Sequence, residues 1–236
     1  MDRSMNRRQL LTNGVASWAV LAVGGLAGRQ ALAADFSAAD ASAALRSALD
    51  RCADIAVQQL GTNNGFLSND KVHIGLPPLL DKAAPVLRAM GRGRQLDELS
   101  NAMNHAAEQA VSQAKPLLVT AIKDMSVDDA TKILKGGDNS VTDYFSAKTR
   151  TPLSASFRPV MDKAFENQPI AKLYTDVARK AAKLRLPVDA SDSLQDHVTQ
   201  RALDGLYFVI GEEERRIRRD PVGTGSALLK KVFGGL

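Results

Sequence analysis

The stretch DGLYFVIGEEERRIRRDP, residues 204–221, decides how the chain folds, because it joins an apolar run to three glutamates and four arginines. Apolar residues that recur three and four positions apart are typical of an α-helix with one buried face. With 100° between successive residues, Leu206, Tyr207 and Ile217 lie within about 60° of Ile210. The stretch is therefore predicted to be a helix that buries this face.

The three glutamates that follow the apolar run differ in direction. Glu213 and Glu214 fall about 60° and 40° from Ile210, inside the apolar arc, whereas Glu212 points away. The pair could form a solvated helix end, a buried structural ion pair, or crowded carboxylates suited to acid–base chemistry. A cation from another helix, such as Arg158, is the partner that burial would require. Glu213, Glu214 and Arg158 are therefore the candidate catalytic residues.

The rest of the chain also shows helical periodicity, and strand-like alternation is almost absent. Helices are predicted over about 38–60, 78–90, 95–113, 116–125, 126–135 and 193–219. Asp192 with Gln195 is expected to cap the last of these. A short helix is expected from residue 140 and a new one from Thr151–Pro152, after which Pro159 and Pro169 divide the chain up to 184. We predict an all-α fold, a single multi-helix, bundle-like domain.

The N-terminus has the features of a signal peptide. A basic start is followed by an apolar segment, residues 14–28, that is short for a membrane span. The small residues at 31–33 predict cleavage between Ala33 and Ala34, so residues 1–33 are the signal and 34–236 the mature domain. NRRQLLT, with Arg7 and Arg8, resembles a twin-arginine motif, and general secretion is the alternative. Both routes predict export, most simply to the periplasm.

Composition narrows the classes of function. The leader carries four arginines against one aspartate, so only about +2 of the formal net charge of +5 remains in the mature domain. A nearly neutral domain does not indicate nucleic-acid binding. The single cysteine, Cys52, excludes an internal disulfide and a cysteine-based zinc site. Cys52 lies on the apolar face of the first predicted helix, so we expect a buried side chain.

Three further motifs are explained without assigning them a catalytic role. His105 and Glu108 have the i,i+3 spacing of a weak metal motif, but both are predicted on an exposed polar face. The arginines of 215–219 occupy the last turn of a helix, where they offset its dipole. Residues 226–236 are amphipathic and could contact a membrane surface or dock on the helices. No catalytic triad order or phosphate-binding loop is present, so no metal and no cofactor is expected.

Several segments resemble one bacterial family, called domain of unknown function 4197. They are GFLSND (65–70), MNHAAEQAV (103–111), DDATKILKGG (128–137), VTQRALDGLYFVIGEEERRIRRDP (198–221) and LLKKVFG (228–234). The resemblance covers roughly residues 40–234 and implies an exported helical protein without assigned catalytic residues. The chain departs from it at His105, where a basic residue is expected, and at Gly211, where alanine is expected.

These observations favour an exported, non-enzymatic helical protein that binds an unknown protein partner or an apolar ligand between its helices. One alternative is a hydrolase-like enzyme that uses Glu213 and Glu214. Another is a structural protein of the envelope that touches a membrane through residues 226–236.

Overall fold

The computed structural model describes residues 38–167, 169, 171, 172, 174, 175 and 193–220. The predicted cleavage site at Ala33 and Ala34, the Arg7–Arg8 motif and the segment 226–236 lie outside these residues. The described part contains helices and no strand, which confirms the all-α prediction. Its helices are α1 (Ala38–Leu60), α2 (Pro78–Ala89), α3 (Gly93–Ser112), α4 (Lys115–Lys123), α5 (Val127–Lys135), α6 (Ser140–Phe165) and α8 (Leu194–Arg219). None of the described helices has the length and apolar character needed to cross a membrane.

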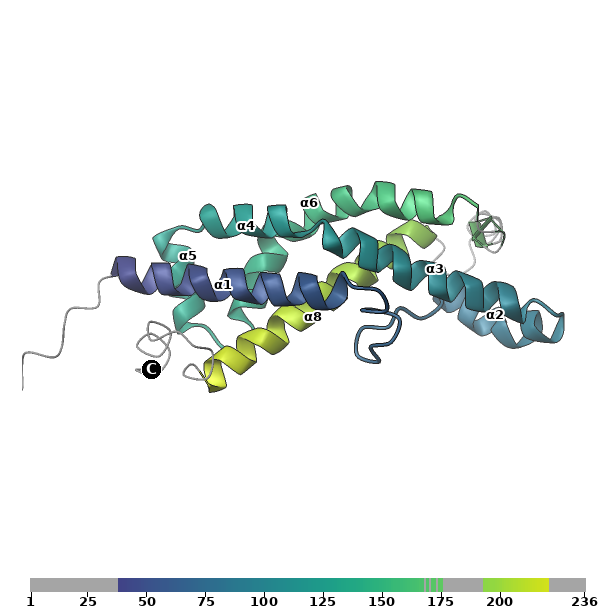
Figure 1. The fold of residues 1–236 in the computed structure, drawn as a ribbon, viewed down its shortest axis with the longest axis horizontal. Coiled ribbons are helices and arrows are strands. Elements are labelled where there is room, and N and C mark those ends of the chain that lie inside the picture. The colour runs from purple at the N-terminus through teal and green to yellow at the C-terminus, as the bar shows by residue number, and fades with distance from the viewer. Residues whose placement is uncertain (1–37, 168, 170, 173, 176–192, 221–236) are drawn as a thin grey trace, which may run out of the picture. The chain divides into compact units, whose positions relative to one another are not determined.

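Helix α8 buries one face against other helices of the described part (Figure 1). It packs most extensively against α6 and also contacts α1 and α3. Its buried face includes Leu206, Tyr207, Ile210 and Ile217, as the periodicity of the opening stretch predicts. Helix α2 packs chiefly against α3, and α5 packs against α1 and α6. The apolar face of the opening stretch therefore forms part of the core.

Helix α6 is continuous, so the prediction that prolines divide this region is wrong between 140 and 165. Pro152 and Pro159 both lie inside the helix. A proline inside a helix loses one hydrogen bond and crowds the preceding turn, at a cost of about 3 kcal/mol. Both prolines are solvent-exposed, whereas Phe157 and Met161 are fully buried. Burial of this apolar face offsets the cost, and water can reach the carbonyl groups that the prolines leave free.

Capping residues fix two of the helix starts. Ser126 and Asp129 form the predicted capping box of α5, with both reciprocal hydrogen bonds present. The box of α8 uses Ser193 and Asp196, not Asp192 and Gln195 as the sequence suggested. Ser193 accepts the Asp196 amide and Asp196 accepts the Ser193 amide, so the prediction was displaced by one residue.

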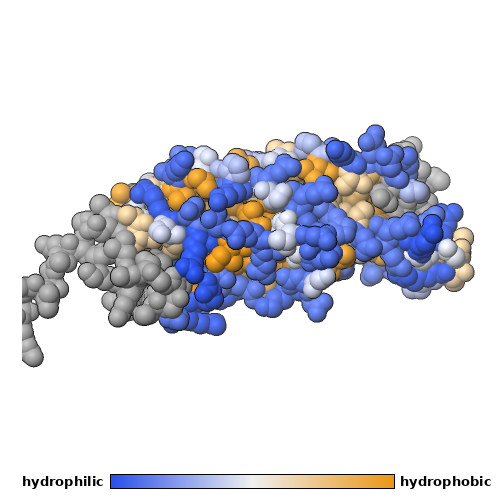
Figure 2. All heavy atoms as spheres, in the orientation of Figure 1, coloured by the Kyte–Doolittle hydropathy of each residue, from blue (hydrophilic) through white to orange (hydrophobic). Residues whose placement is uncertain are grey.

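The apolar residues form one continuous core that includes every described helix. Its largest fully buried side chains include Phe66, Phe145 and Phe157. Cys52 is 1% exposed, which confirms its predicted burial. On the face drawn in Figure 2, hydrophilic residues separate the apolar ones into small patches.

The loop between α1 and α2 also contributes a large side chain to this core. Phe66, in the loop between α1 and α2, is completely buried and lies against Gly205 of α8. A Cβ atom at Gly205 would lie 2.7 Å from Cε1 of Phe66 and 3.3 Å from Cβ of Val72. Only glycine leaves the space that this loop occupies on α8.

We predict that Gly205→Ala destabilises the domain by about 1–3 kcal/mol, because the buried ring must move out of its rotamer. The loss occurs although alanine is the better helix former by about 1 kcal/mol. Urea unfolding of the mature domain, followed by far-UV circular dichroism, measures the change.

Gly75→Ala is the matched control, since no atom lies within 4 Å of its added methyl group. It should change stability by no more than about 0.5 kcal/mol. A second variant, Phe66→Leu, should reduce the penalty of Gly205→Ala. An increase in stability from Gly205→Ala alone would show that the Phe66 ring tolerates the added methyl group, which would contradict the close contact.

Candidate functional site

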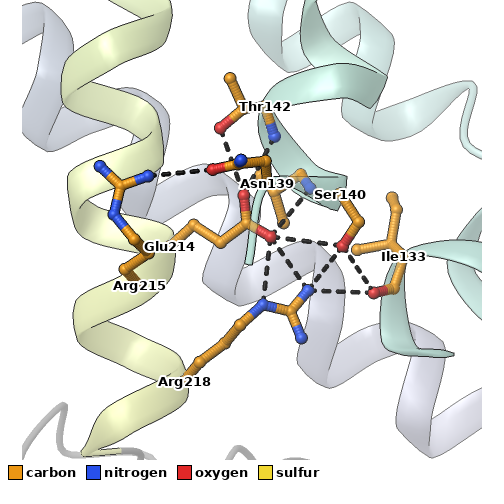
Figure 3. Close-up of polar contacts among 8 residues, drawn as sticks. Ile133, Asn139, Ser140, Thr142, Glu214, Arg215 and Arg218 are labelled. Carbon is orange, nitrogen blue, oxygen red and sulfur yellow. Dashed lines mark hydrogen bonds and ion pairs between the residues drawn. The ribbon is translucent and has the colours of Figure 1, made fainter. Parts of the chain in front are cut away.

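Glu214 is buried, with 2% of its surface exposed, and it caps another helix (Figure 3). Its Oε1 accepts the backbone N–H of Val141 at 3.0 Å, and its Oε2 accepts the N–H of Thr142 at 3.1 Å. These N–H groups belong to the first turn of α6, where the N-cap side chain usually accepts them. Asn139, the N-cap of α6, makes no such bond. A carboxylate from α8 therefore replaces the local cap.

Arg218, one turn after Glu214 on α8, binds both Glu214 and the last turn of α5. Its Nε and Nη2 atoms lie 3.1 and 3.0 Å from Oε1 of Glu214. Nη2 also donates to the carbonyl oxygen of Ile133, in the last turn of α5, at 3.0 Å and to Oγ of Ser140 at 2.7 Å. The pair thus places a negative charge at the start of α6 and a positive charge at the end of α5. Both placements are favourable for the helix dipoles.

The neighbouring charges of α8 are also committed to contacts within the protein. Glu212 pairs with Lys71 of the loop after α1, and Glu213 pairs with Arg216. Arg215 donates to Oδ1 of Asn139, which explains why that side chain does not cap α6 (Figure 3). The three glutamates therefore occupy three different environments, and the solvated helix end that sequence favoured does not describe Glu214.

Arg158 lies elsewhere. It donates to Asp196 at the start of α8 at 2.6 Å and lies 3.8 Å from Asp162. The cation that the buried carboxylate requires is Arg218, on the same helix. The i,i+4 spacing of Glu214 and Arg218 is the sequence signal that could have identified this pair.

A small apolar cavity lies beside the ion pair. It has a volume of about 10 Å³ and is lined by Leu45, Ala48, Leu49, Cys52, Val141, Glu214, Ile217 and Arg218. Burial, with the charges of Glu213 and Glu214, raises the pKa of the Cys52 thiol to about 12. A thiol with such a pKa is protonated and unreactive at neutral pH. The cavity therefore does not activate the Cys52 thiol.

A second buried carboxylate, Glu108, holds the loop 61–77. Its Oε1 accepts the backbone N–H groups of Phe66 and Leu67 at 3.1 and 3.2 Å, and its Oε2 lies 2.8 Å from Nδ1 of His105. The prediction that Glu108 lies on an exposed face is wrong, since the residue is 4% exposed. His105, with 41% of its side chain exposed, lies at the edge of the protein.

Asn104 supports the other end of the same loop. It is completely buried, and its Oδ1 accepts the N–H of Ile74 at 2.9 Å while its Nδ2 donates to the Ile74 carbonyl at 3.0 Å. Two side chains of α8 also contact this loop. Glu212 forms an ion pair with Lys71, and Nε2 of His197 contacts the Gly75 carbonyl oxygen. The sequence analysis missed both Asn104 and this network, because the loop that covers them is remote in the sequence.

A metal site finds no support in the described residues, where no three His, Cys, Asp or Glu side chains gather closely enough to hold an ion. Each buried carboxylate instead binds backbone N–H groups and one basic side chain. This arrangement fixes segments of the chain, and it leaves neither carboxylate with a free oxygen to act on a substrate.

We predict that Glu214→Ala costs about 3–5 kcal/mol of the free energy of unfolding, because it removes the carboxylate beside the buried Arg218 and leaves the N–H groups of Val141 and Thr142 without their acceptor. Glu214→Gln keeps an acceptor and should cost about 1.5–3 kcal/mol. Chemical unfolding followed by circular dichroism gives both values.

Glu213→Gln provides the matched control, since its ion pair with Arg216 is partly exposed and contributes less than about 1 kcal/mol. Adding Arg218→Met to Glu214→Ala should recover part of the loss, because the buried positive charge that has lost its carboxylate is then removed as well. Equal effects of Glu213→Gln and Glu214→Gln would contradict the capping role.

We also predict that Cys52 in the folded protein reacts with a thiol reagent at pH 8 on the order of 100-fold more slowly than in urea. The folded pKa of the Cys52 thiol, about 12, lies above its ordinary value of 9.0, so its contribution to stability is complete below pH 9 and is lost as the pH rises towards 12. Glu214→Gln should accelerate labelling by loosening the contact between α1 and α8. Rapid labelling of the unmodified domain would contradict this burial.

Comparison with known proteins identifies a family and nothing finer. Residues 35–234 match the family described as protein of unknown function (DUF4197). No curated protein and no solved structure matches the chain. The match covers nearly all of the predicted mature domain and confirms the resemblance of the motifs. The chain therefore belongs to the DUF4197 family.

Proposed function

We propose that the protein is a non-enzymatic binding protein of the periplasm and that the loop 61–77 is its recognition segment. The observation that carries the proposal is the use of two buried polar side chains, Asn104 and Glu108, to hold the backbone of one loop. Burial of a carboxylate costs several kcal/mol unless all its partners are in place. Loops that a rigid scaffold holds in this way commonly carry recognition.

The exposed part of the loop supports this assignment. Ser68 and Asp70 are solvent-exposed, while Phe66, which contacts α8 at Gly205 and Glu108 of α3, is completely buried. The buried ring and the hydrogen bonds fix the backbone, so the exposed side chains keep a defined arrangement. A pre-arranged loop loses little conformational entropy when it binds a partner.

The charge network argues against the hydrolase-like alternative that uses Glu213 and Glu214. A catalytic acid or base needs access to a substrate within hydrogen-bond distance. Glu214 is enclosed by the first turn of α6 and by Arg218, and Arg158 lies at a different ion pair. The cavity beside them holds about 10 Å³, which is room for about one water molecule. The same volume favours a partner on the surface over an apolar ligand between α1 and α8.

Export is supported by the sequence and by the extent of the family. The family match begins at residue 35, directly after the predicted cleavage bond between Ala33 and Ala34. The larger compact unit of the chain begins at Ser37. A domain that begins at a predicted cleavage site is the expected product of a signal peptidase.

We predict that a photo-crosslinking amino acid at Ser68 or Asp70 captures a partner in intact cells, because both positions lie on the exposed side of the loop. The control is Lys163 on α6, which is exposed but remote from the loop in the sequence and contacts none of its residues in the network above. Mass spectrometry identifies the captured species. Identical products from Ser68 and Lys163, or none from either loop position, would refute the loop as the recognition segment.

A further inference from the structure

An open polar hollow lies where the end of α1, the start of the 61–77 loop and the last turns of α3 meet. It has a volume of about 440 Å³ and is lined by Gly61, Thr62, Asn63, His105, Glu108, Gln109 and Ser112. This volume is in the range of about 300–1,000 Å³ that small-molecule sites occupy. Gly61, Thr62 and Asn63 belong to the start of the loop 61–77, whereas the exposed positions Ser68 and Asp70 do not line the hollow.

His105 is the oriented group of this hollow. Its Nδ1 lies 2.8 Å from Oε2 of Glu108, and Glu108 is itself fixed by the N–H groups of Phe66 and Leu67. A carboxylate at Nδ1 selects the tautomer that carries its proton there, which makes Nε2 a hydrogen-bond acceptor. Within the described part of the chain, Nε2 makes no hydrogen bond. The ring is therefore held by the protein on one side and available to a ligand on the other.

The other lining groups are hydroxyls and amides. Thr62 donates its hydroxyl hydrogen to the Gln59 carbonyl at 3.1 Å, and Ser112 donates to the Gln109 carbonyl at 2.7 Å, so both oxygens remain acceptors. Within the described part of the chain, the side-chain amides of Asn63 and Gln109 make no hydrogen bond. An amide can donate and accept at once. The hollow thus offers both kinds of hydrogen-bonding group.

The chemistry of the lining excludes most other ligands. It contains no lysine or arginine, which the binding of phosphates or carboxylates usually requires. Its only carboxylate, Glu108, already accepts three hydrogen bonds and is 4% exposed, so it offers little to a cation. No large apolar side chain lines the hollow, so a fatty chain would bury no surface there.

We propose that this hollow binds a neutral, hydroxyl-rich ligand, a sugar, and that His105 is its central recognition residue. Sugar hydroxyl groups donate and accept hydrogen bonds, as the amides and the imidazole of the lining require. No aromatic ring lines the hollow to stack on the sugar, so the affinity rests on hydrogen bonds alone. A dissociation constant in the millimolar range, about 1–10 mM, follows from so few contacts.

The test is a titration of the ¹⁵N-labelled mature domain with glucose and with N-acetylglucosamine, followed by NMR. We expect saturable shifts of the resonances of Asn63, His105 and Gln109. His105→Ala and Gln109→Ala should each weaken binding about threefold to tenfold, the effect of one neutral hydrogen bond. His73→Ala and Gln113→Ala are the matched controls, because both side chains are exposed and lie outside the hollow.

Three results would overturn the proposal. They are the absence of saturable shifts with either sugar, equal effects of His105→Ala and His73→Ala, and stronger shifts with inorganic phosphate than with the sugars. The outcome is independent of the partner proposed for the loop, which is tested by crosslinking at Ser68 and Asp70. Sugar-induced shifts without crosslinks would remove only the partner, and crosslinks without shifts would remove only the sugar.

Discussion

The ion pair of Glu214 and Arg218 is the interaction on which the arrangement of α5, α6 and α8 depends. The carboxylate takes the place of an N-cap for α6, and the guanidinium binds a carbonyl in the last turn of α5. A buried charge is tolerated only when its hydrogen-bonding capacity is filled, so the pair allows few alternative positions for the turn between α5 and α6. Apolar packing supplies most of the stability, and the ion pair selects one arrangement among those that packing allows.

Glu108 of α3 repeats this solution at the loop 61–77. It accepts two successive backbone N–H groups from a remote segment and contacts one basic side chain, as Glu214 does. The segment it holds is an irregular loop, whose polar groups would otherwise be buried without partners beside Phe66. Asn104 satisfies the same need at Ile74. Asn104, Glu108 and Glu214 therefore all use their buried polar atoms to bind backbone groups of a remote segment.

Local signals predicted much of the fold, and non-local contacts account for the errors. The capping box of Ser126 and the apolar face around Ile210 are visible in the sequence, because each depends on residues within a few turns. The angular position of Glu214 placed it correctly in the apolar arc, but its donors come from α6 and cannot be read from α8. Glu108 lies to one side of the apolar face of α3 and is buried by a loop some forty residues earlier. Pro152 and Pro159 misled the prediction because a proline on the exposed side of a well-packed helix does not end it.

Glu108 links the two surfaces to which function is assigned. Its Oε1 holds Phe66 and Leu67 in the loop, while its Oε2 orients the imidazole that faces the hollow. A ligand group that donates a hydrogen bond to Nε2 of His105 strengthens the hydrogen bond that Nδ1–H donates to Glu108. One carboxylate therefore fixes both the backbone of the loop and the orientation of the imidazole.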